Sequence, residues 1–204
     1  MLTPRLLIAS GNRHKVREIR ALLEGLPAEV LGLEDLPFVP EEPEETGATF
    51  TDNALLKARY YSGFFEGCVL ADDSGLIVPA LGGAPGVLSA RYAGSGADDE
   101  ANRRKLLESL RASGFTEPAA DFVCVLCFAA PGQPPAFFLG RWPGRIASAA
   151  RGTRGFGYDP LFIPEGHSCT VAELSPEEKN RLSHRGQALA KFRGHFAKFL
   201  GRDP

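Results

Sequence analysis

An apolar run that ends in a small polar turn and leads straight into an amphipathic helix opens this chain, and no other segment constrains the fold as strongly. In order, the residues are Leu6, Leu7, Ile8, Ala9, Ser10, Gly11, Asn12, Arg13, His14 and Lys15. Apolar residues then recur at helical spacing from Val16 to Leu26, and Gly25 and Pro27 end the pattern. The segment predicts a strand followed by a helix.

The start of this helix has the layout of an anion site. The first backbone N–H groups of a helix and the positive end of its dipole point at the turn, and Arg13 and Lys15 add full charges. Together these features suit a phosphate. An ordinary connection in which Ser10 or Asn12 caps the helix explains the same residues as well. On this segment alone, both interpretations stay open.

Composition limits the classes of function. At 204 residues with 44% hydrophobic residues, the chain suits one globular domain with a sizeable core. Its 23 Lys and Arg nearly balance its 25 Asp and Glu, so the net charge of −2 gives no field suited to duplex nucleic acid. Neither a signal peptide nor a membrane-spanning run is evident, so we expect a cytoplasmic protein with no nucleic-acid or membrane partner.

The cysteines fit a packed core better than a metal site. Most lie in apolar surroundings, as buried thiols of a reducing compartment do; they are Cys68, Cys124, Cys127 and Cys169. The spacing of Cys124 and Cys127 would suit zinc or a redox pair, but residues 122–130 have the pattern of a strand. Side chains three apart on a strand face opposite ways, so these two thiols cannot hold one ion.

Strands and helices alternate along the rest of the chain. Helices are predicted over 49–65, over 98–112 and from Ser175 onward. Asn53 and Lys57 are expected on the surface of the first of these helices. Residues 68–72 and 76–80 predict a strand that breaks at a polar kink, and 122–130 with 136–141 predict an antiparallel hairpin. The acidic, proline-rich segment 36–45 predicts an exposed or mobile loop. The combination favours a mixed sheet.

Adjacent carboxylates end the first of these strand runs, just before a glycine. Because neighbouring strand residues point to opposite faces, only one of Asp72 and Asp73 can enter a given site. Such an acid could hold Mg²⁺, which prefers one or two carboxylates together with waters and phosphate oxygens. An Asp-Ser-Gly turn with solvated acids is the alternative. The phosphate-like turn at the start of the chain favours the metal interpretation.

Two further segments carry residues suited to a nucleotide base. Phe156 and Tyr158 flank Gly157 beside Asp159, and an aromatic ring can stack on a flat base. A β-turn with core aromatics is the alternative. Residues 179–185 are cationic and could donate hydrogen bonds to base carbonyls or phosphates, although a solvated helix face explains them equally well.

Six segments in order closely resemble the inosine triphosphate pyrophosphatase family, which hydrolyses dITP, ITP and XTP. They are SGNRHK (10–15), EETGATFTDNALLKA (44–58), ADDSGL (71–76), LGGAPGVLSARYAG (81–94), GFGYDPLF (155–162) and ELSPEEKNRLSHRGQAL (173–189). The resemblance spans nearly the whole chain. It implies one α/β domain over 1–204 with a long, twisted mixed sheet flanked by helices, two lobes around a central cleft, a homodimer, and a Mg²⁺ requirement.

The resemblance also implies roles for individual residues. Ser10, Gly11, Asn12, Arg13, His14 and Lys15 form the triphosphate cradle, and Lys57 is a further phosphate contact. Asp73 is metal ligand and catalytic base, Ser74 lies beside it, and Glu45, or alternatively Glu44, is the second acid at the metal. The residues implied to hold the purine are Phe156, Gly157, Tyr158, Asp159, Lys179, His184 and Arg185. Arg154 departs from the pattern, since many relatives have glycine there.

The implied reaction converts a nonstandard purine nucleoside triphosphate and water to the monophosphate and pyrophosphate. Donors from Lys179, His184 or Arg185 would select the 6-keto oxygen over an adenine amino group. A related pyrophosphatase for other modified nucleotides and a noncatalytic nucleotide-binding module remain as alternatives. The chain contains no GxxxxGK[ST] run, which excludes an ordinary P-loop NTPase.

Overall fold

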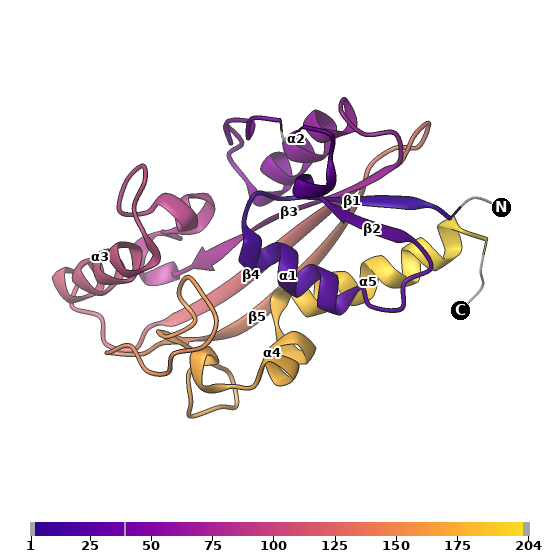
Figure 1. Cartoon of the computed structure of the whole chain (residues 1–204). Helices are drawn as coiled ribbons and strands as arrows, with labels where there is room; N and C mark the ends of the chain where they lie inside the picture. The colour runs from indigo at the N-terminus through magenta and orange to yellow at the C-terminus, as the bar shows by residue number, and fades with distance from the viewer. Residues whose placement is uncertain (1–2, 39, 202–204) are drawn as a thin grey trace. The chain divides into compact units, whose positions relative to one another are not determined.

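Six strands of the described chain form one sheet in the order β2-β1-β3-β4-β5-β6 (Figure 1). A computed structural model describes residues 3–38 and 40–201, so Val39 of the predicted acidic loop lies outside the described residues. The strands are β1 Arg5–Ala9, β2 Glu29–Gly32, β3 Cys68–Ile77, β4 Ala119–Ala129, β5 Ala136–Ile146 and β6 Phe162–Pro164. Since β1 pairs in parallel with β2 and β3 whereas β5 pairs antiparallel with β6, the sheet is mixed, as predicted.

The predicted hairpin is also confirmed. β4 and β5 are neighbours in the sheet, and only residues 130–135 join them. A parallel pair would need a crossover of a dozen residues or more, so this short connection makes the pair antiparallel. Both strands extend further than the sequence predicts.

The helices start where the sequence places their capping residues. They are α1 Arg13–Leu22, α2 Phe50–Ser62, α3 Asp99–Ala112, α4 Pro176–Leu182 and α5 His184–Phe199, and short 3₁₀ segments cover Leu33–Asp35, Pro79–Leu81, Gly86–Arg91 and Val171–Glu173. Asn12, Thr49, Asp98 and Ser175 each accept a hydrogen bond from a backbone N–H of the first turn. Capping by these side chains satisfies donors that the helix itself leaves without partners.

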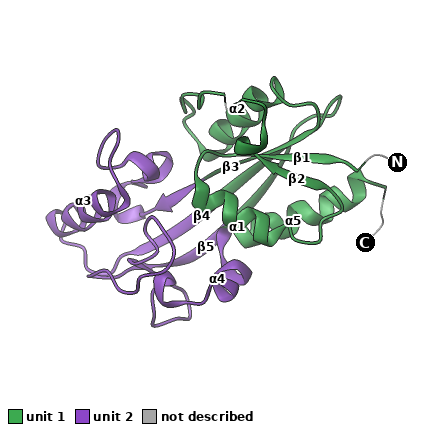
Figure 2. Cartoon of the chain, in the orientation of Figure 1, with its two compact units in different colours: residues 1–73, 124–140, 185–204 green, residues 74–123, 141–184 purple. Residues whose placement is uncertain are grey.

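The chain divides into two compact units, each built from separate stretches of sequence (Figure 2). Unit 1 comprises residues 1–73, 124–140 and 185–204, and unit 2 comprises 74–123 and 141–184. β3 and β4 therefore contribute residues to both units, and β5 does the same. Asp73 is the last residue of the first stretch of unit 1.

Unit 1 carries helices on both faces of its part of the sheet (Figure 1). Leu6 and Ile8 of β1 lie in one buried cluster with Val16 of α1 and Phe192 of α5. The α2 helix contacts β1 from the other face and buries an apolar stripe of Ala54, Ala58 and Tyr61. Alternation along the strands thus sends successive side chains into two different helical layers.

Unit 2 has its own core. Leu76 and Val78 pack with Leu106 and Leu110 of α3, and with Phe162 of β6. The aromatic segment 156–159 lies in the connection from β5 to β6, and Tyr158 from this segment packs into the same core.

One strand prediction is wrong in an informative way. β3 does not break at its polar residues but runs continuously over Cys68–Ile77. The Leu76 amide donates to Ser89 Oγ at 2.9 Å, and that hydroxyl donates to the Gly86 carbonyl at 2.6 Å. A Cβ on Gly75 would overlap Ser89 and the Gly86 carbonyl, so the strand stays extended because the 3₁₀ segment packs directly against its glycine. The short strand β2 was not predicted.

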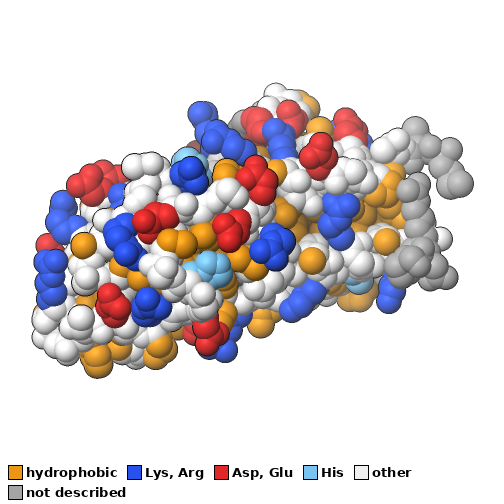
Figure 3. All heavy atoms as spheres, turned by 90° about the horizontal axis from the view of Figure 1, so that it is seen from below, with side chains coloured by type: hydrophobic (Ala, Val, Ile, Leu, Met, Phe, Trp, Pro, Cys, Tyr) orange, Lys and Arg blue, Asp and Glu red, His pale blue; other side chains and the backbone are white. Residues whose placement is uncertain are grey.

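The acidic segment 36–45 follows the 3₁₀ segment Leu33–Asp35, and its described residues have no regular structure, as predicted. Contacts nevertheless fix this segment to the rest of unit 1. Glu42 accepts a hydrogen bond from the Gly11 amide, Glu45 binds Lys57, and Pro40 is buried. Figure 3 shows basic and acidic side chains interspersed over the face it presents, in keeping with the small net charge. Among the described helices, none is long and apolar enough to cross a membrane.

Candidate active site

The pleat of β3 sends Asp72 and Asp73 to opposite faces of the sheet, as predicted. Cys68 and Leu70 point into the cluster formed with α1 and α5, and Asp72 is next in that register. Asp73 therefore points toward the α2 face, where Lys57 of α2 reaches it. Both carboxylates are buried, with 1% and 5% of their surface exposed, so their surroundings control their chemistry.

Asp72 is the centre of a buried ion cluster. Its carboxylate accepts hydrogen bonds from Lys15 Nζ at 2.7 Å, Arg185 Nε at 2.9 Å and Cys124 Sγ at 3.2 Å. Burial alone would raise the pKa of Asp72, but Arg185 and Lys15 outweigh it and hold the pKa well below 3.8. Burial, and then the Asp72 charge, raises the pKa of the Cys124 thiol. Asp72 thus stays ionised and Cys124 stays a thiol.

Arg185 of α5 belongs to this cluster. Its side chain is 2% exposed, and a second bond from Nη1 reaches Glu18 Oε2 at 2.6 Å. The guanidinium therefore joins α5 to β3 and α1 within unit 1. Paired carboxylates are the partners that make a buried guanidinium tolerable. Among the other residues implied to hold the purine, His184 directly precedes Arg185 in the chain.

Asp73 has a different environment, set by Lys57 and Glu45. Lys57 Nζ donates to Asp73 Oδ1 at 2.8 Å and to Glu45 Oε1 at 2.9 Å. Burial raises the pKa of Asp73 above 3.8, and Lys57 opposes this only in part. Burial would lower the pKa of Lys57, but the two carboxylates outweigh it and raise that pKa. Lys57 and Asn53 are buried, not on the helix surface as predicted, because the acidic segment covers α2 there.

One oxygen of Asp73 has no hydrogen-bond partner in the described chain. Oδ2 is buried and accepts no bond, while Oδ1 is held by Lys57. A buried polar atom without a partner is costly, so a structure keeps one mainly where a ligand, water or ion completes it. Asp73 Oδ2 is therefore the atom in unit 1 best placed to act on a substrate.

The same pair of carboxylates suits a magnesium ion. Within 3–38 and 40–201, no group of three His, Cys, Asp or Glu side chains is arranged to hold a metal. Mg²⁺ needs only one or two carboxylates and takes its remaining ligands from water and phosphate. Asp73 and Glu45 both bind the Lys57 ammonium, and Asp73 Oδ2 has no partner in the described chain, so this pair of carboxylates fits Mg²⁺. Glu44 is exposed, whereas Glu45 is half-buried against Lys57.

The turn before α1 shows features of both interpretations that its sequence allows. Asn12 Oδ1 accepts bonds from the amides of His14 and Lys15 at 3.0 and 3.1 Å, as an ordinary cap does. The Gly11 amide, however, donates to a carboxylate, Glu42 Oε1, at 3.1 Å. An anionic group from the acidic segment thus occupies one amide of the predicted phosphate turn. Ser10 Oγ accepts from the Asn12 amide, and Arg13 and His14 are exposed.

In unit 2, the segment Phe156 to Asp159 is held in a tight loop. Asp159 Oδ2 accepts from the Phe156 amide at 2.9 Å and from Lys179 Nζ at 2.6 Å. That ammonium lies 4.7 Å from the centroid of the Phe156 ring. Tyr158 is buried, and its hydroxyl donates to the Ser89 carbonyl at 2.9 Å. The structure thus brings together all four loop residues and Lys179.

His184 and Arg154 lie at other points of unit 2. The His184 ring stacks on Phe122, with centroids 4.8 Å apart and planes 10° apart. Arg154 Nη1 donates to the carbonyls of Glu173 and Leu174, which fixes the loop where the sequence departs from the family pattern. Ser74, the first residue of unit 2, is half-buried beside Asp73 in β3.

Sequence reasoning missed several residues that hold the site. Asp99 and Arg103 of α3 both bind the Gly157 peptide, and Glu42 binds the phosphate-like turn. The only signal for the first two is their spacing of four on a helix, which places them on one face. Nothing in the sequence indicates which loop that face meets.

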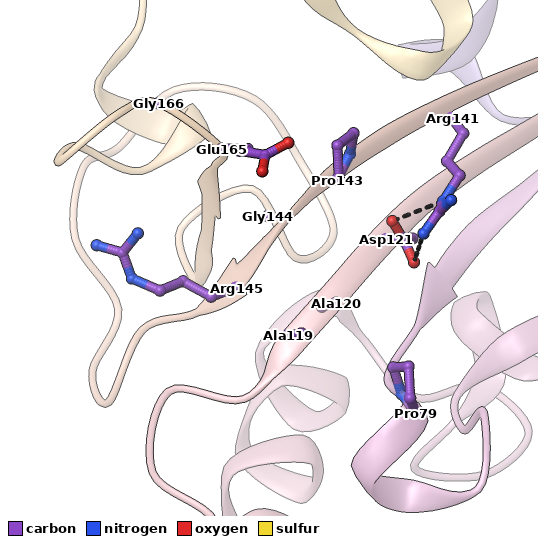
Figure 4. A pocket seen from close by; sticks show the side chains of 10 residues that line it. All are labelled: Pro79, Ala119, Ala120, Asp121, Arg141, Pro143, Gly144, Arg145, Glu165 and Gly166. Carbon is purple, nitrogen blue, oxygen red and sulfur yellow. Dashed lines mark hydrogen bonds and ion pairs between the residues drawn. The ribbon is translucent and has the colours of Figure 1, made fainter.

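Unit 2 also has an open groove of about 370 Å³ that contains none of the predicted site residues (Figure 4). Its lining residues are Pro79, Ala119, Ala120, Asp121, Arg141, Pro143, Gly144, Arg145, Glu165 and Gly166. Asp121 accepts two hydrogen bonds from Arg141, at 2.8 and 2.9 Å, which Figure 4 marks across adjacent strands. Arg141 is exposed, whereas Asp121 is mostly covered, and the two bonds form a bidentate pair.

Comparison with known proteins shows which family combines these features. The model of the Ham1 family matches residues 6–195. This chain belongs to the Ham1 family. It is 49% identical to the dITP/XTP pyrophosphatase of Geobacter sulfurreducens over 94% of this chain and 96% of that protein. It is 48% identical to the dITP/XTP pyrophosphatase of an Exiguobacterium species, over 96% of this chain and 98% of that protein.

Solved structures agree with the fold of this Ham1 family member. A HAM1 protein from Coxiella burnetii matches with a TM-score of 0.87 and 41% identity, covering 96% of this chain and 99% of that one. The resemblance seen in the six motifs and the predicted mixed α/β fold are therefore confirmed.

Proposed function

We propose that this Ham1 family chain hydrolyses nonstandard purine nucleoside triphosphates, namely dITP, ITP and XTP, to the monophosphate and pyrophosphate. The observation that carries the proposal is the buried Asp73 Oδ2, which has no partner in the described chain and lies beside the Lys57–Glu45 pair. The names of the curated relatives support the same activity. Removing such triphosphates would cleanse the nucleotide pool.

In unit 1, Asp73 is the general base. A water oxygen forms a bond to the α-phosphorus, the bond from that phosphorus to the bridging oxygen of the β-phosphate breaks, and pyrophosphate leaves with the electron pair. The proton of the water passes to the Asp73 carboxylate. The raised pKa of Asp73 suits this role, because a base accepts a proton more readily as its pKa approaches the working pH.

Cations of unit 1 stabilise the charge of the triphosphate. An ammonium has three N–H donors, and Lys57 uses two of them on Asp73 and Glu45, so the third can reach a phosphate oxygen. Lys15 and the turn from Ser10 onward are further phosphate contacts. Asp73 and Glu45 would hold Mg²⁺, which when bound supplies further stabilisation of negative charge on the phosphate oxygens.

In unit 2, the loop and the cations next to it recognise the base. Phe156 presents an aromatic ring, and Lys179 and His184 supply donors for the 6-keto oxygen of hypoxanthine or xanthine. Adenine carries an amino group at that position, so a donor there would lose its partner, and such losses reject a substrate strongly. Arg185 is the third cation that the resemblance implies for the base, and its bond to Asp72 also ties it to β3.

We also propose that the protein acts as a homodimer in the cytoplasm. Exposed large apolar side chains, such as Phe38 of unit 1 and Leu88 of unit 2, offer surface for a second copy. Light scattering coupled to size-exclusion chromatography measures the mass directly, and a single-chain mass at all concentrations would contradict the dimer.

A substrate panel tests the proposed function. Purified protein is incubated with dITP, XTP, GTP and ATP, with and without Mg²⁺, and pyrophosphate and phosphate are measured separately. We expect rapid, Mg²⁺-dependent release of pyrophosphate from dITP and XTP, and slow turnover of ATP and GTP. Equal hydrolysis of ATP would contradict the base assignment, release of phosphate alone would contradict attack at the α-phosphorus, and binding without turnover would indicate a noncatalytic module.

A further inference from the structure

Gly157 in unit 2 is held at both its amide and its carbonyl by one face of α3. The Gly157 amide donates to Asp99 Oδ2 at 2.6 Å, and the Gly157 carbonyl accepts from Arg103 Nη1 at 2.7 Å. Asp99 and Arg103 are four residues apart on α3, so they lie on the same face of the helix. Both bonds involve a charged side chain, which makes them shorter and stronger than bonds between neutral groups.

This pair of bonds, which we name the α3 clamp, fixes the loop at its most adaptable residue. Gly157 has a φ of +58°, a left-handed conformation that glycine adopts without strain. A Cβ at Gly157 would meet no atom of the described chain within 4 Å, so this side of the loop is open. Without the clamp, the bond from the Asp159 amide to the Phe156 carbonyl would remain, but the Gly157 carbonyl would lose its described partner.

The remaining loop tethers come from other elements. Phe156 and Asp159 are joined to each other and to Lys179 of α4, and Tyr158 is joined to Ser89. These bonds, and the Asp159 amide that donates to the Phe156 carbonyl at 3.1 Å, hold the loop on both sides of Gly157. Among the bonds described for the loop, the α3 clamp alone engages both the amide and the carbonyl of Gly157.

We propose that Asp99 and Arg103 are positioning residues for base recognition, which act by holding the Gly157 peptide and thereby the angle at which the Phe156 ring meets the base. The inference rests on the proposed function and adds two residues to it. Because neither residue takes part in proton transfer or phosphate binding, the clamp governs substrate affinity and base selectivity and leaves the chemical step unchanged. An effect of this kind raises KM at constant kcat.

Matched controls exist on the same helix. Arg104 and Arg111 line the same groove of about 480 Å³ along α3 as Arg103. Arg104→Ala therefore removes an equal charge from this helix while the Arg103 bond to Gly157 is kept. Glu100 is the other acid of the first turn, so Glu100→Gln controls for the favourable interaction of Asp99 with the helix dipole. Thermal unfolding of every variant shows whether the fold is kept.

The experiment measures kcat and KM for dITP and for dATP, in wild type and in Arg103→Ala, Arg103→Lys, Asp99→Ala and Asp99→Asn. We expect Arg103→Ala and Asp99→Ala each to raise the KM for dITP about tenfold with kcat within about twofold, the size of effect that one charged hydrogen bond supports. Arg103→Lys and Asp99→Asn, which keep a donor or an acceptor, should restore most of the affinity. The preference for dITP over dATP should fall in the two alanine variants alone.

Outcomes separate this inference from the proposed function. If wild type releases pyrophosphate from dITP but the four clamp variants match the controls in KM and selectivity, the clamp has no role in recognition. A fall in kcat at unchanged KM would overturn the inference equally, because it would place the effect in the chemical step. If wild type does not turn over dITP at all, both proposals fail together.

Discussion

Asp72 and Asp73 are neighbours in β3, yet the two sides of the sheet give them opposite properties. On the α1 and α5 side, Asp72 is surrounded by Arg185, Lys15 and a thiol, and its pKa is held well below 3.8. On the α2 side, Asp73 has Lys57 on one oxygen and no partner described for the other, and burial raises its pKa. Both oxygens of the Asp72 carboxylate are paired, whereas the Asp73 carboxylate has one oxygen with no described partner.

The difference teaches how a strand can place a structural and a reactive group side by side. The pleat separates two adjacent side chains into different layers, so each can be given its own partners. Strong pairing on one face holds β3 in register with α1 and α5. That rigidity is what allows the other face to keep a buried, incompletely satisfied carboxylate.

Asp73→Asn tests the reactive side and has the largest expected effect. The amide cannot accept a proton from water, so turnover of dITP should fall by about 10²–10⁴-fold, the usual contribution of a general base. Steady-state kinetics with pyrophosphate detection measure the loss. Thermal unfolding checks that the variant keeps its fold, since Glu45 still pairs with Lys57 after the change. Near-normal turnover would refute the assignment.

Asp72→Asn tests the structural side. Breaking a buried, multiply paired ion cluster leaves Arg185 and Lys15 without their shared partner, so unfolding free energy should fall by about 3–5 kcal/mol. Urea unfolding near pH 7 measures the loss.

The pH dependence of the same two variants sharpens the contrast, because the signs are opposite. Asp72 has a folded pKa below 3.8, so its stabilisation is complete above that value and is lost as the pH falls through the folded pKa. Asp73 has a folded pKa above 3.8, so its ionisation costs stability as the pH rises from 3.8 through the folded pKa. The deficit of Asp72→Asn should therefore shrink below pH 3.8, and a deficit that is independent of pH would contradict the cluster.

Cys124→Ala has the smallest expected effect. The thiol donates to Asp72 Oδ2 at 3.2 Å, but Arg185 and Lys15 still hold the carboxylate after its removal. Cys127→Ala is the matched control, since Cys127 is buried on the opposite face of the same strand. Urea unfolding should show Cys124→Ala less stable than the control by about 1 kcal/mol, a typical value for one hydrogen bond. Equal stabilities would show that the thiol adds nothing to the cluster.

Local patterns predicted much of this molecule. The caps Asn12, Thr49, Asp98 and Ser175 mark helix starts because capping depends only on residues within one turn. The strand-to-helix turn and the hairpin follow from hydrophobic periodicity for the same reason. The alternation of side chains along a strand was enough to predict that Asp72 and Asp73 point to opposite faces of the sheet.

Features that depend on contacts distant in sequence could not be predicted. β3 stays continuous because Ser89 binds it, and Lys57 is buried because Glu45 returns to it from the acidic loop. Arg185 looks like a surface cation in sequence, yet α5 carries it to Asp72, 113 residues away. The motif resemblance supplied the candidate residues. The ion pairs that these residues form in the folded chain could not be predicted from the motifs.

Glu42 gives the phosphate-like turn a resident anion. Since its carboxylate already accepts from the Gly11 amide, an incoming phosphate there exchanges one negative group for another instead of filling an empty position. A lone inorganic phosphate would gain little from that exchange. The proposed triphosphate would be held at several points at once, so under that proposal the turn would select by the number of linked phosphates as well as by their charge.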